Sequence, residues 1–101
     1  MKSFNNLTHA EAERLALLLE ELGEAQQAIG KVLRHGYGST HPDGGPNNKV
    51  ALERELGDVR CATWLLCDAG DLDNENIEAS AGRKIATVSK YMHHQPKAGL
   101  M

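Results

Sequence analysis

Residues 15–33 read LALLLEELGEAQQAIGKVL, and the spacing of their apolar side chains predicts a long α-helix. Apolar residues recur at steps of three and four, the period of one helix face. Three carboxylates lie within this apolar stretch, which is unusual for a helix that faces a core. The predicted inner stripe consists of Leu15, Leu18, Leu22, Ala25, Ile29 and Leu33.

Start and stop signals divide the rest of the chain into helices and one long loop. Thr8 and Glu11 have the spacing of a capping box, which predicts the first helix start. Asn47 or Asn48 can cap a second helix, and Asp71 or Asp73 a third. The loop holds four glycines and two prolines. The predicted segments are helices at about 8–34, 48–68 and 73–93, a loop at 35–47 and a flexible tail at 95–101.

The pattern predicts an all-α protein, because every predicted helix is apolar along one face and no strand pattern is present. We expect residues 1–101 to form a single domain in which a third helix joins a helical hairpin. A chain of 101 residues buries little surface by itself. We therefore expect a homodimer or homotetramer that completes a four-helix-type bundle.

Charge and composition argue against two classes of partner, nucleic acids and membranes. The net charge of −3 provides no basic surface for polymeric nucleic acid. No segment approaches the ~20 apolar residues of a membrane span, and the N-terminus lacks the pattern of a signal peptide. We expect a cytoplasmic protein without a membrane partner, in which Cys61 and Cys67 are reduced, buried thiols.

Four carboxylates fall on or beside the predicted inner faces. Glu21 and Glu24 lie ~60° apart on the first helix, and Glu55 and Asp58 have the same spacing on the second, where we expect them to share the buried face. Burial of ionised carboxylates is costly unless a cation compensates them. The pattern therefore predicts a divalent cation between the two helices.

The donor atoms indicate which divalent ion would bind. Carboxylate oxygens without a thiolate or imidazole suit Mg²⁺, with Mn²⁺ as the alternative. A di-iron site would need a Glu-x-x-His motif, which neither acidic pair contains. Because Mg²⁺ commonly links protein carboxylates to phosphates, a nucleotide or pyrophosphate is the expected ligand. Lys84, and Tyr91 two turns further along the third helix, are the candidate substrate-binding residues, although Lys84 equally fits a side chain that extends into solvent.

The two acidic motifs together resemble a known signature. Residues 20–24 followed by residues 55–58 are similar to the EExxE…ExxD motif of MazG-like all-α nucleoside triphosphate pyrophosphohydrolases, which are related to dimeric dUTPases. The resemblance covers roughly residues 15–92. It implies that Glu21, Glu24, Glu55 and Asp58 bind metal, that Glu20 assists and that Lys84 holds phosphate. The gap between the motifs is slightly longer than usual for the family, and the excess falls in the loop.

The resemblance implies Mg²⁺-dependent cleavage of an NTP or dNTP to the monophosphate and pyrophosphate. In this hypothesis, Glu20 or Glu21 orients or deprotonates the attacking water. Glu20 points away from the apolar stripe, so a solvated position suits it equally well. The alternative is a non-enzymatic helical dimer that senses a nucleotide or binds another protein.

Overall fold

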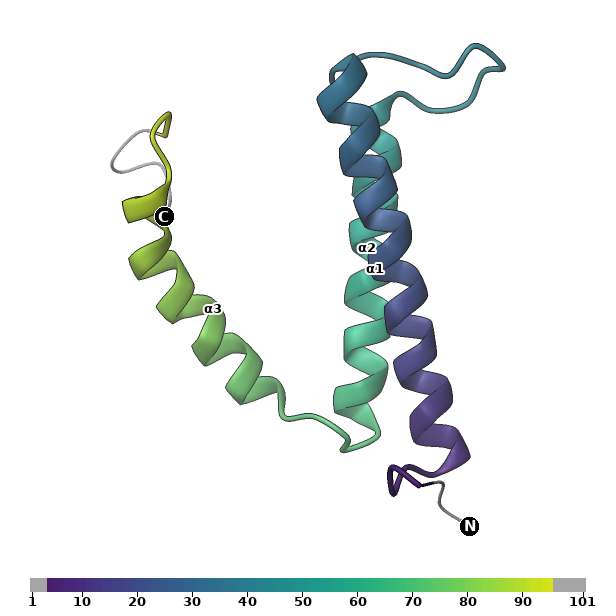
Figure 1. Ribbon diagram of the computed structural model, residues 1–101, viewed down its shortest axis with the longest axis vertical. Helices are drawn as coiled ribbons and strands as arrows, with labels where there is room; N and C mark the ends of the chain where they lie inside the picture. The colour runs from purple at the N-terminus through teal and green to yellow at the C-terminus, as the bar shows by residue number, and fades with distance from the viewer. Residues whose placement is uncertain (1–3, 96–101) are drawn as a thin grey trace. The chain divides into compact units, whose positions relative to one another are not determined.

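The computed structural model describes residues 4–95, and within them the protein is all-α, as predicted (Figure 1). The elements are α1 (His9–His35), α2 (Asn48–Asp68), α3 (Asn74–Val88) and a short 3₁₀ turn (Ser89–Tyr91). No strand occurs in this range, apart from an isolated antiparallel bridge between Thr40 and Asn47. Among these residues, no helix has the combination of length and apolar character that crossing a bilayer demands.

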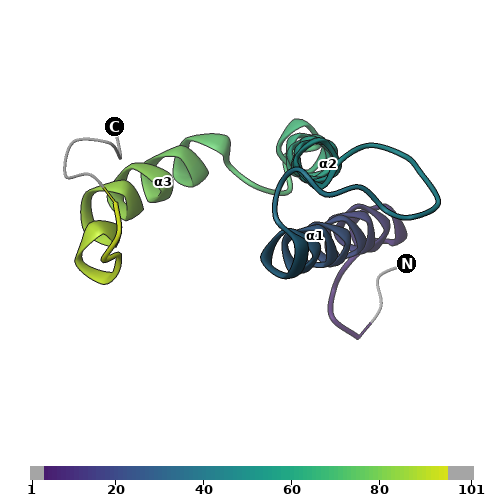
Figure 2. The ribbon, with the colours of Figure 1, turned by 90° about the horizontal axis from the view of Figure 1, so that it is seen from above.

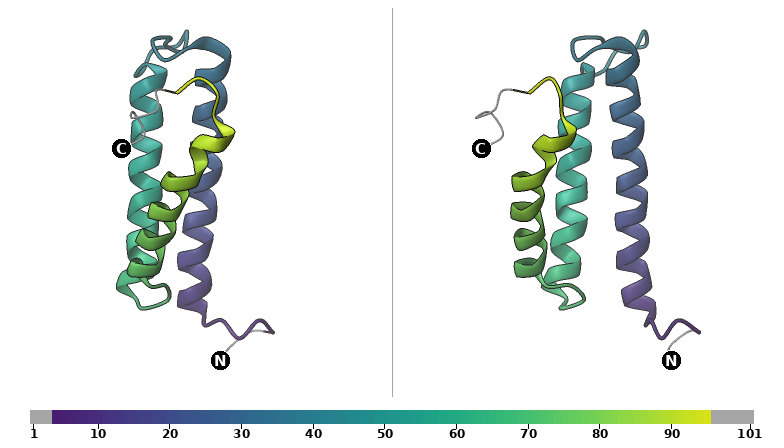
Figure 3. Two further views of the ribbon diagram at one scale, coloured as in Figure 1. Left: turned by 90° about the vertical axis from the view of Figure 1, so that its left-hand side faces the viewer. Right: turned by 60° about the vertical axis from the view of Figure 1, so that its left-hand side comes forward.

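The chain divides into two compact units, Met1–Asp71 and Leu72–Met101. The first unit contains the hairpin of α1 and α2, whose helices lie side by side in Figures 2 and 3. The second contains α3 and the 3₁₀ turn. The single domain expected from the sequence, and its completion by oligomerisation, stay predictions.

Local hydrogen bonds explain where α1 begins and ends. The Glu11 backbone N–H donates to Thr8 Oγ1 at 3.1 Å, and the Thr8 N–H donates to Glu11 Oε1 at 2.8 Å. This is the predicted capping box, which satisfies backbone donors at the helix start. At the other end, Gly36 adopts a φ of 84° and its N–H donates to the Val32 carbonyl at 2.7 Å. A left-handed φ favours glycine, so the helix ends at His35, one residue later than predicted.

The two asparagines before α2 have separate roles. Asn47 is the cap, because its Oδ1 accepts from the Val50 N–H at 2.9 Å. Asn48 lies inside the helix and donates from Nδ2 to the Gly36 carbonyl at 3.0 Å. Gly70, with a φ of 82°, follows the helix end at Asp68 as predicted.

Helix α3 begins as predicted and ends early. Asp73 Oδ1 accepts from the Glu75 N–H at 2.8 Å and caps the helix. The prediction that it reaches residue 93 was wrong, because the α-helix ends at Val88. Two β-branched residues, Thr87 and Val88, close the helix, and such side chains lose rotamer freedom there. Of the tail predicted at 95–101, residues 96–101 lie outside the described range.

The hairpin core consists mainly of alanines. Within the described residues, the buried apolar side chains are Ala25, Ala28, Ala62 and Leu66, and Leu66 is fully buried. The predicted stripe on α1 was therefore partly wrong. Its members that remain exposed, with 41 to 82 % of their surface accessible, are Leu15, Leu22, Ile29 and Leu33.

The physical reason is the width of the apolar arc on α1. Ala25 is buried and Leu18 is half-buried, while Leu15 and Leu22 lie ~60° further round the helix and are exposed. A single neighbouring helix covers only one side of so wide an arc. The expectation of buried thiols was also wrong for Cys61, which is exposed; Cys67 is half-buried, and both cysteines are free.

One ion pair joins the open end of the hairpin. Arg14 on α1 donates from Nε to Asp71 Oδ2 at 2.6 Å and from Nη2 to Oδ1 at 3.1 Å. This two-pronged geometry is the strong form of an arginine–carboxylate contact. It ties the turn after α2 to the beginning of α1, at the opposite end from the loop.

Candidate metal centre

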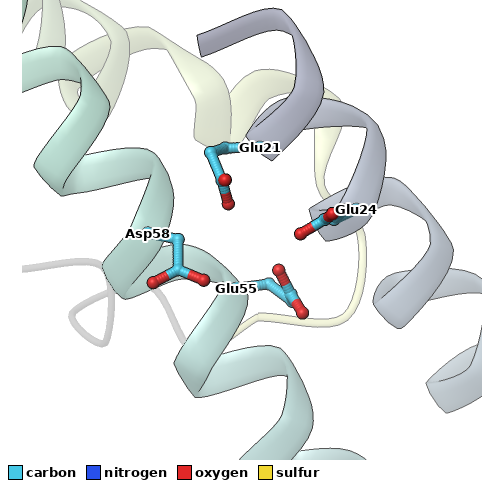
Figure 4. Close-up of side chains that lie close together, drawn as sticks. All are labelled: Glu21, Glu24, Glu55 and Asp58. Carbon is cyan, nitrogen blue, oxygen red and sulfur yellow. The ribbon is translucent and has the colours of Figure 1, made fainter. Parts of the chain in front are cut away.

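The structure brings together the four carboxylates that the sequence singled out. Glu21 and Glu24 extend from adjacent turns of α1, and Glu55 and Asp58 from adjacent turns of α2 (Figure 4). Each contributes one oxygen to a set in which all the atoms lie within 4.8 Å of one another. The predicted convergence is confirmed, and we call these four residues the carboxylate cluster.

Small side chains explain why the two helices approach closely enough for their carboxylates to meet. Ala25 follows Glu21 by about one helical turn, and Ala62 follows Asp58 in the same way. Both alanines are buried, at 5 % and 1 % exposure. The spacing of packed helices depends on the side chains at their contact, and alanine permits a short one. The carboxylates therefore meet across the helix interface.

The four carboxylates of the cluster differ in their exposure to solvent. Glu21 and Glu55 are half-buried, whereas Glu24 and Asp58 are exposed. The expectation that Asp58 shares a buried face with Glu55 was therefore wrong. Asp58 lies ~60° around α2 from Glu55, which takes it to the edge of the interface.

The buried oxygens of the cluster have no partner. Oε2 of Glu21 and Oε2 of Glu55 are inaccessible to solvent and accept no hydrogen bond from the described residues. Within residues 4–95, no Lys, Arg or His forms an ion pair with any of the four carboxylates. Buried oxygens of this kind carry a desolvation cost that a bound cation would offset.

Electrostatics favour protonation at two positions. Burial raises the pKa of Glu21, and the negative charges of Glu24, Asp58, Glu20 and Glu55 add to the effect. A side-chain hydrogen bond with Glu55 raises the pKa of Glu24, and the charge of Glu55 raises it further. Both shifts have the direction expected when carboxylates crowd together. A divalent cation would reverse that direction by favouring the ionised forms.

The donor set fits a hard divalent ion. All four residues offer carboxylate oxygens, and the cluster contains no thiolate or imidazole. Such donors suit Mg²⁺ or Mn²⁺ more than Zn²⁺ or Cu²⁺. The exposed oxygens of Glu24 and Asp58 leave one side of the cluster open, so a ligand phosphate could approach from solvent.

The other predicted site residues are not part of the cluster. Glu20 is exposed and lies outside the set of converging oxygens. Lys84 and Tyr91 belong to the second compact unit, in which both side chains are exposed. Their assignment to substrate stays a prediction.

A cavity beside the cluster contains residues that the sequence interpretation missed. Its volume is about 290 Å³, and it is lined by both Glu24 and Glu55. Gln27 and Lys31 from α1 and Asn48 from α2 also line it. The spacing of Glu24, Gln27 and Lys31 by three and four residues is the signal that could have found them.

Comparison with known proteins yields no relative for the chain. No family model, no curated protein and no solved structure matches it significantly.

Proposed function

We propose that the protein is a Mg²⁺-dependent nucleoside triphosphate pyrophosphohydrolase, with Mn²⁺ as an alternative ion. The observation that carries the proposal is the carboxylate cluster, in which four oxygens lie within 4.8 Å and two side chains have buried, unpaired oxygens. The same four residues form the two motifs that resemble the MazG-like signature.

The reaction adds water across the phosphoanhydride between the α- and β-phosphates, and the products are a nucleoside monophosphate and pyrophosphate. Bound at the cluster, the cation would neutralise phosphate charge and lower the pKa of a coordinated water. Glu21, Glu24, Glu55 and Asp58 supply its ligands. Glu20 and Glu21 are the candidates to orient the attacking water or accept its proton.

Of these two residues, only Glu21 has a carboxylate in the converging set, so it would lie nearer than Glu20 to a water held by a cluster-bound cation. Glu20 is exposed and outside the cluster. Lys84 and Tyr91 remain the proposed substrate-binding residues of the second unit.

The test is to incubate the protein with each NTP and dNTP plus Mg²⁺ and to measure pyrophosphate release. Glu55→Gln and Asp58→Asn keep the side-chain sizes and remove ligand charge. We expect each substitution to reduce pyrophosphate release by at least ~100-fold. Removal of one electrostatic contact to a transition state typically lowers the rate by about this factor.

The matched controls are Glu53→Gln and Asp68→Asn, which change exposed acids of the same helix outside the cluster. They should retain activity. Pyrophosphate release that survives both cluster substitutions would disprove the site. Saturable triphosphate binding without any turnover would instead support the nucleotide-sensing alternative.

A further inference from the structure

A second, larger cavity continues from the carboxylate cluster toward the loop. Its volume is about 570 Å³, within the usual range of small-molecule sites. It shares Lys31, Asn48 and Ala51 with the smaller cavity, which Glu24 and Glu55 line. The two cavities therefore form one connected surface, with carboxylates at one end and the loop at the other.

The larger cavity has the opposite electrostatic character to the cluster. Lys31 and Arg34 from α1 line it, together with His35 and His41. No aspartate or glutamate is among its described lining residues, and neither Lys31 nor Arg34 forms an ion pair within residues 4–95. Two uncompensated cations beside a hydroxyl-bearing loop are suited to an anion.

The loop over this cavity is held by long-range hydrogen bonds. The Asn48 N–H donates to the Ser39 carbonyl at 2.9 Å, and the Lys49 N–H donates to the Tyr37 carbonyl at 3.0 Å. The Asn48 side chain also ties α2 to the Gly36 carbonyl. A loop fixed in this way loses less conformational freedom when a ligand binds.

Donors on the loop add to the cationic lining. The hydroxyls of Ser39 and Thr40 line the cavity. His41 Nδ1 accepts from the Asp43 N–H at 3.0 Å and lies 3.6 Å from Asp43 Oδ2, so Nε2 is the ring nitrogen left to donate to a ligand. No Phe, Tyr or Trp lines the cavity within the described residues, so the imidazoles of His35 and His41 are the aromatic rings there on which a nucleobase could stack.

The geometry points to the larger cavity as the site of the terminal pyrophosphate part of a metal-bound triphosphate, with Lys31 and Arg34 as its cationic ligands. Lys31 lies ~10 Å along α1 from Glu24, and Arg34 ~15 Å, which suits an extended anion more than a single ion. This inference rests on the function proposed above. It assigns a phosphate-binding role to residues of the hairpin itself.

The experiment is a calorimetric titration of the full chain with inorganic pyrophosphate, in the presence and absence of saturating Mn²⁺. The double variant Lys31→Ala/Arg34→Ala should weaken pyrophosphate binding by about tenfold or more. The reason is that loss of one hydrogen bond to a charged group lowers a binding affinity by about that factor. Its affinity for Mn²⁺ alone should remain that of the unmodified protein, since the cluster is intact.

The control is Arg54→Ala/Arg60→Ala, which removes the same charge from exposed positions outside both cavities. It should bind pyrophosphate normally. Equal weakening in both double variants, no weakening in either, or no pyrophosphate binding by the unmodified protein would overturn the inference. The proposed function fails separately, if Glu55→Gln and Asp58→Asn leave pyrophosphate release intact.

Discussion

Glu21 has the least favourable surroundings of the four cluster residues. Its Oε2 is buried without a hydrogen-bond partner, and four other carboxylates contribute to its raised pKa. Glu24 also has a raised pKa, through its contact with Glu55. These residues oppose folding at neutral pH unless a cation is present, because their ionised forms are disfavoured in the folded protein.

This electrostatic cost predicts a particular pH dependence for the metal-free protein. Raised pKa values mean that the folded state retains protons on Glu21 and Glu24 that the unfolded state has lost. Stability should therefore fall as the pH rises from the ordinary value of 4.5 through the raised values. Urea unfolding in EDTA at a series of pH values measures this decline, and Glu21→Gln/Glu24→Gln should reduce it.

The control for this prediction is Glu13→Gln/Glu53→Gln, which changes two exposed acids outside the cluster. It should retain the decline. Asp71 acts in the opposite direction, because its hydrogen bonds with Arg14 lower its pKa below 3.8 and its contribution is lost only as the pH falls. An unchanged decline in the cluster variant would show that crowding of these carboxylates does not limit stability.

Between the helices, close packing and the metal-site geometry depend on the same small residues. Ala62 is 1 % exposed on the α2 face that meets α1, about one turn beyond Asp58. We expect Ala62→Leu to force the helices apart and to destabilise the hairpin by ~1–3 kcal/mol. The same separation should weaken Mn²⁺ binding, because the carboxylates would no longer converge.

Cys61→Leu is the control, since it adds a leucine at the neighbouring, exposed position of α2. Chemical denaturation and Mn²⁺ titration of both variants provide the comparison. If Ala62→Leu were as stable as the control and bound Mn²⁺ equally well, alanine packing would not determine the helix spacing.

Local and periodic features were predictable from the sequence. Thr8 and Glu11 form their capping box within one turn, so no knowledge of the fold is required. The convergence of Glu21 with Glu55 followed from helical periodicity on two antiparallel helices. Contacts that depend on which side of a helix is covered by its neighbour were harder to predict.

The apolar arc of α1 illustrates this difference. A helical wheel identifies Leu15, Leu18 and Leu22 as one apolar side, but it does not indicate which part of that side α2 covers. The cavity beneath the loop escaped prediction for a related reason. It depends on hydrogen bonds of Asn48 to residues 9 and 12 positions away, which no local pattern encodes.

For the molecule as a whole, the exposed apolar row on α1 is the feature that remains to be explained. Its members are Leu15, Leu19, Leu22, Ile29 and Leu33. Their spacing by three, four or seven residues places them along one side of the helix, as in helix–helix contacts. Because isolated exposed leucines are ordinary but a continuous row is not, this surface favours packing against another helix.

We expect the full chain to form a homodimer or homotetramer, and sedimentation velocity over a range of concentrations measures it. Leu22→Glu/Ile29→Glu should shift the protein toward monomer by placing charge on the row. Glu13→Lys, at an exposed position ~120° round α1 from Leu19, should leave the assembly unchanged. A wild-type protein that is monomeric at all concentrations would contradict this expectation.

A titration of the metal-free protein with Mn²⁺, followed by loss of the free-ion EPR signal, bears on the carboxylate cluster without requiring a known substrate. We predict saturable binding to the wild-type protein and at least ~10-fold weaker binding to Glu55→Gln/Asp58→Asn, because two charged ligands are lost. Binding to Glu53→Gln/Asp68→Asn should be unchanged. If the wild-type protein bound no Mn²⁺, or if the two double variants bound it equally, the cluster would not be a metal centre.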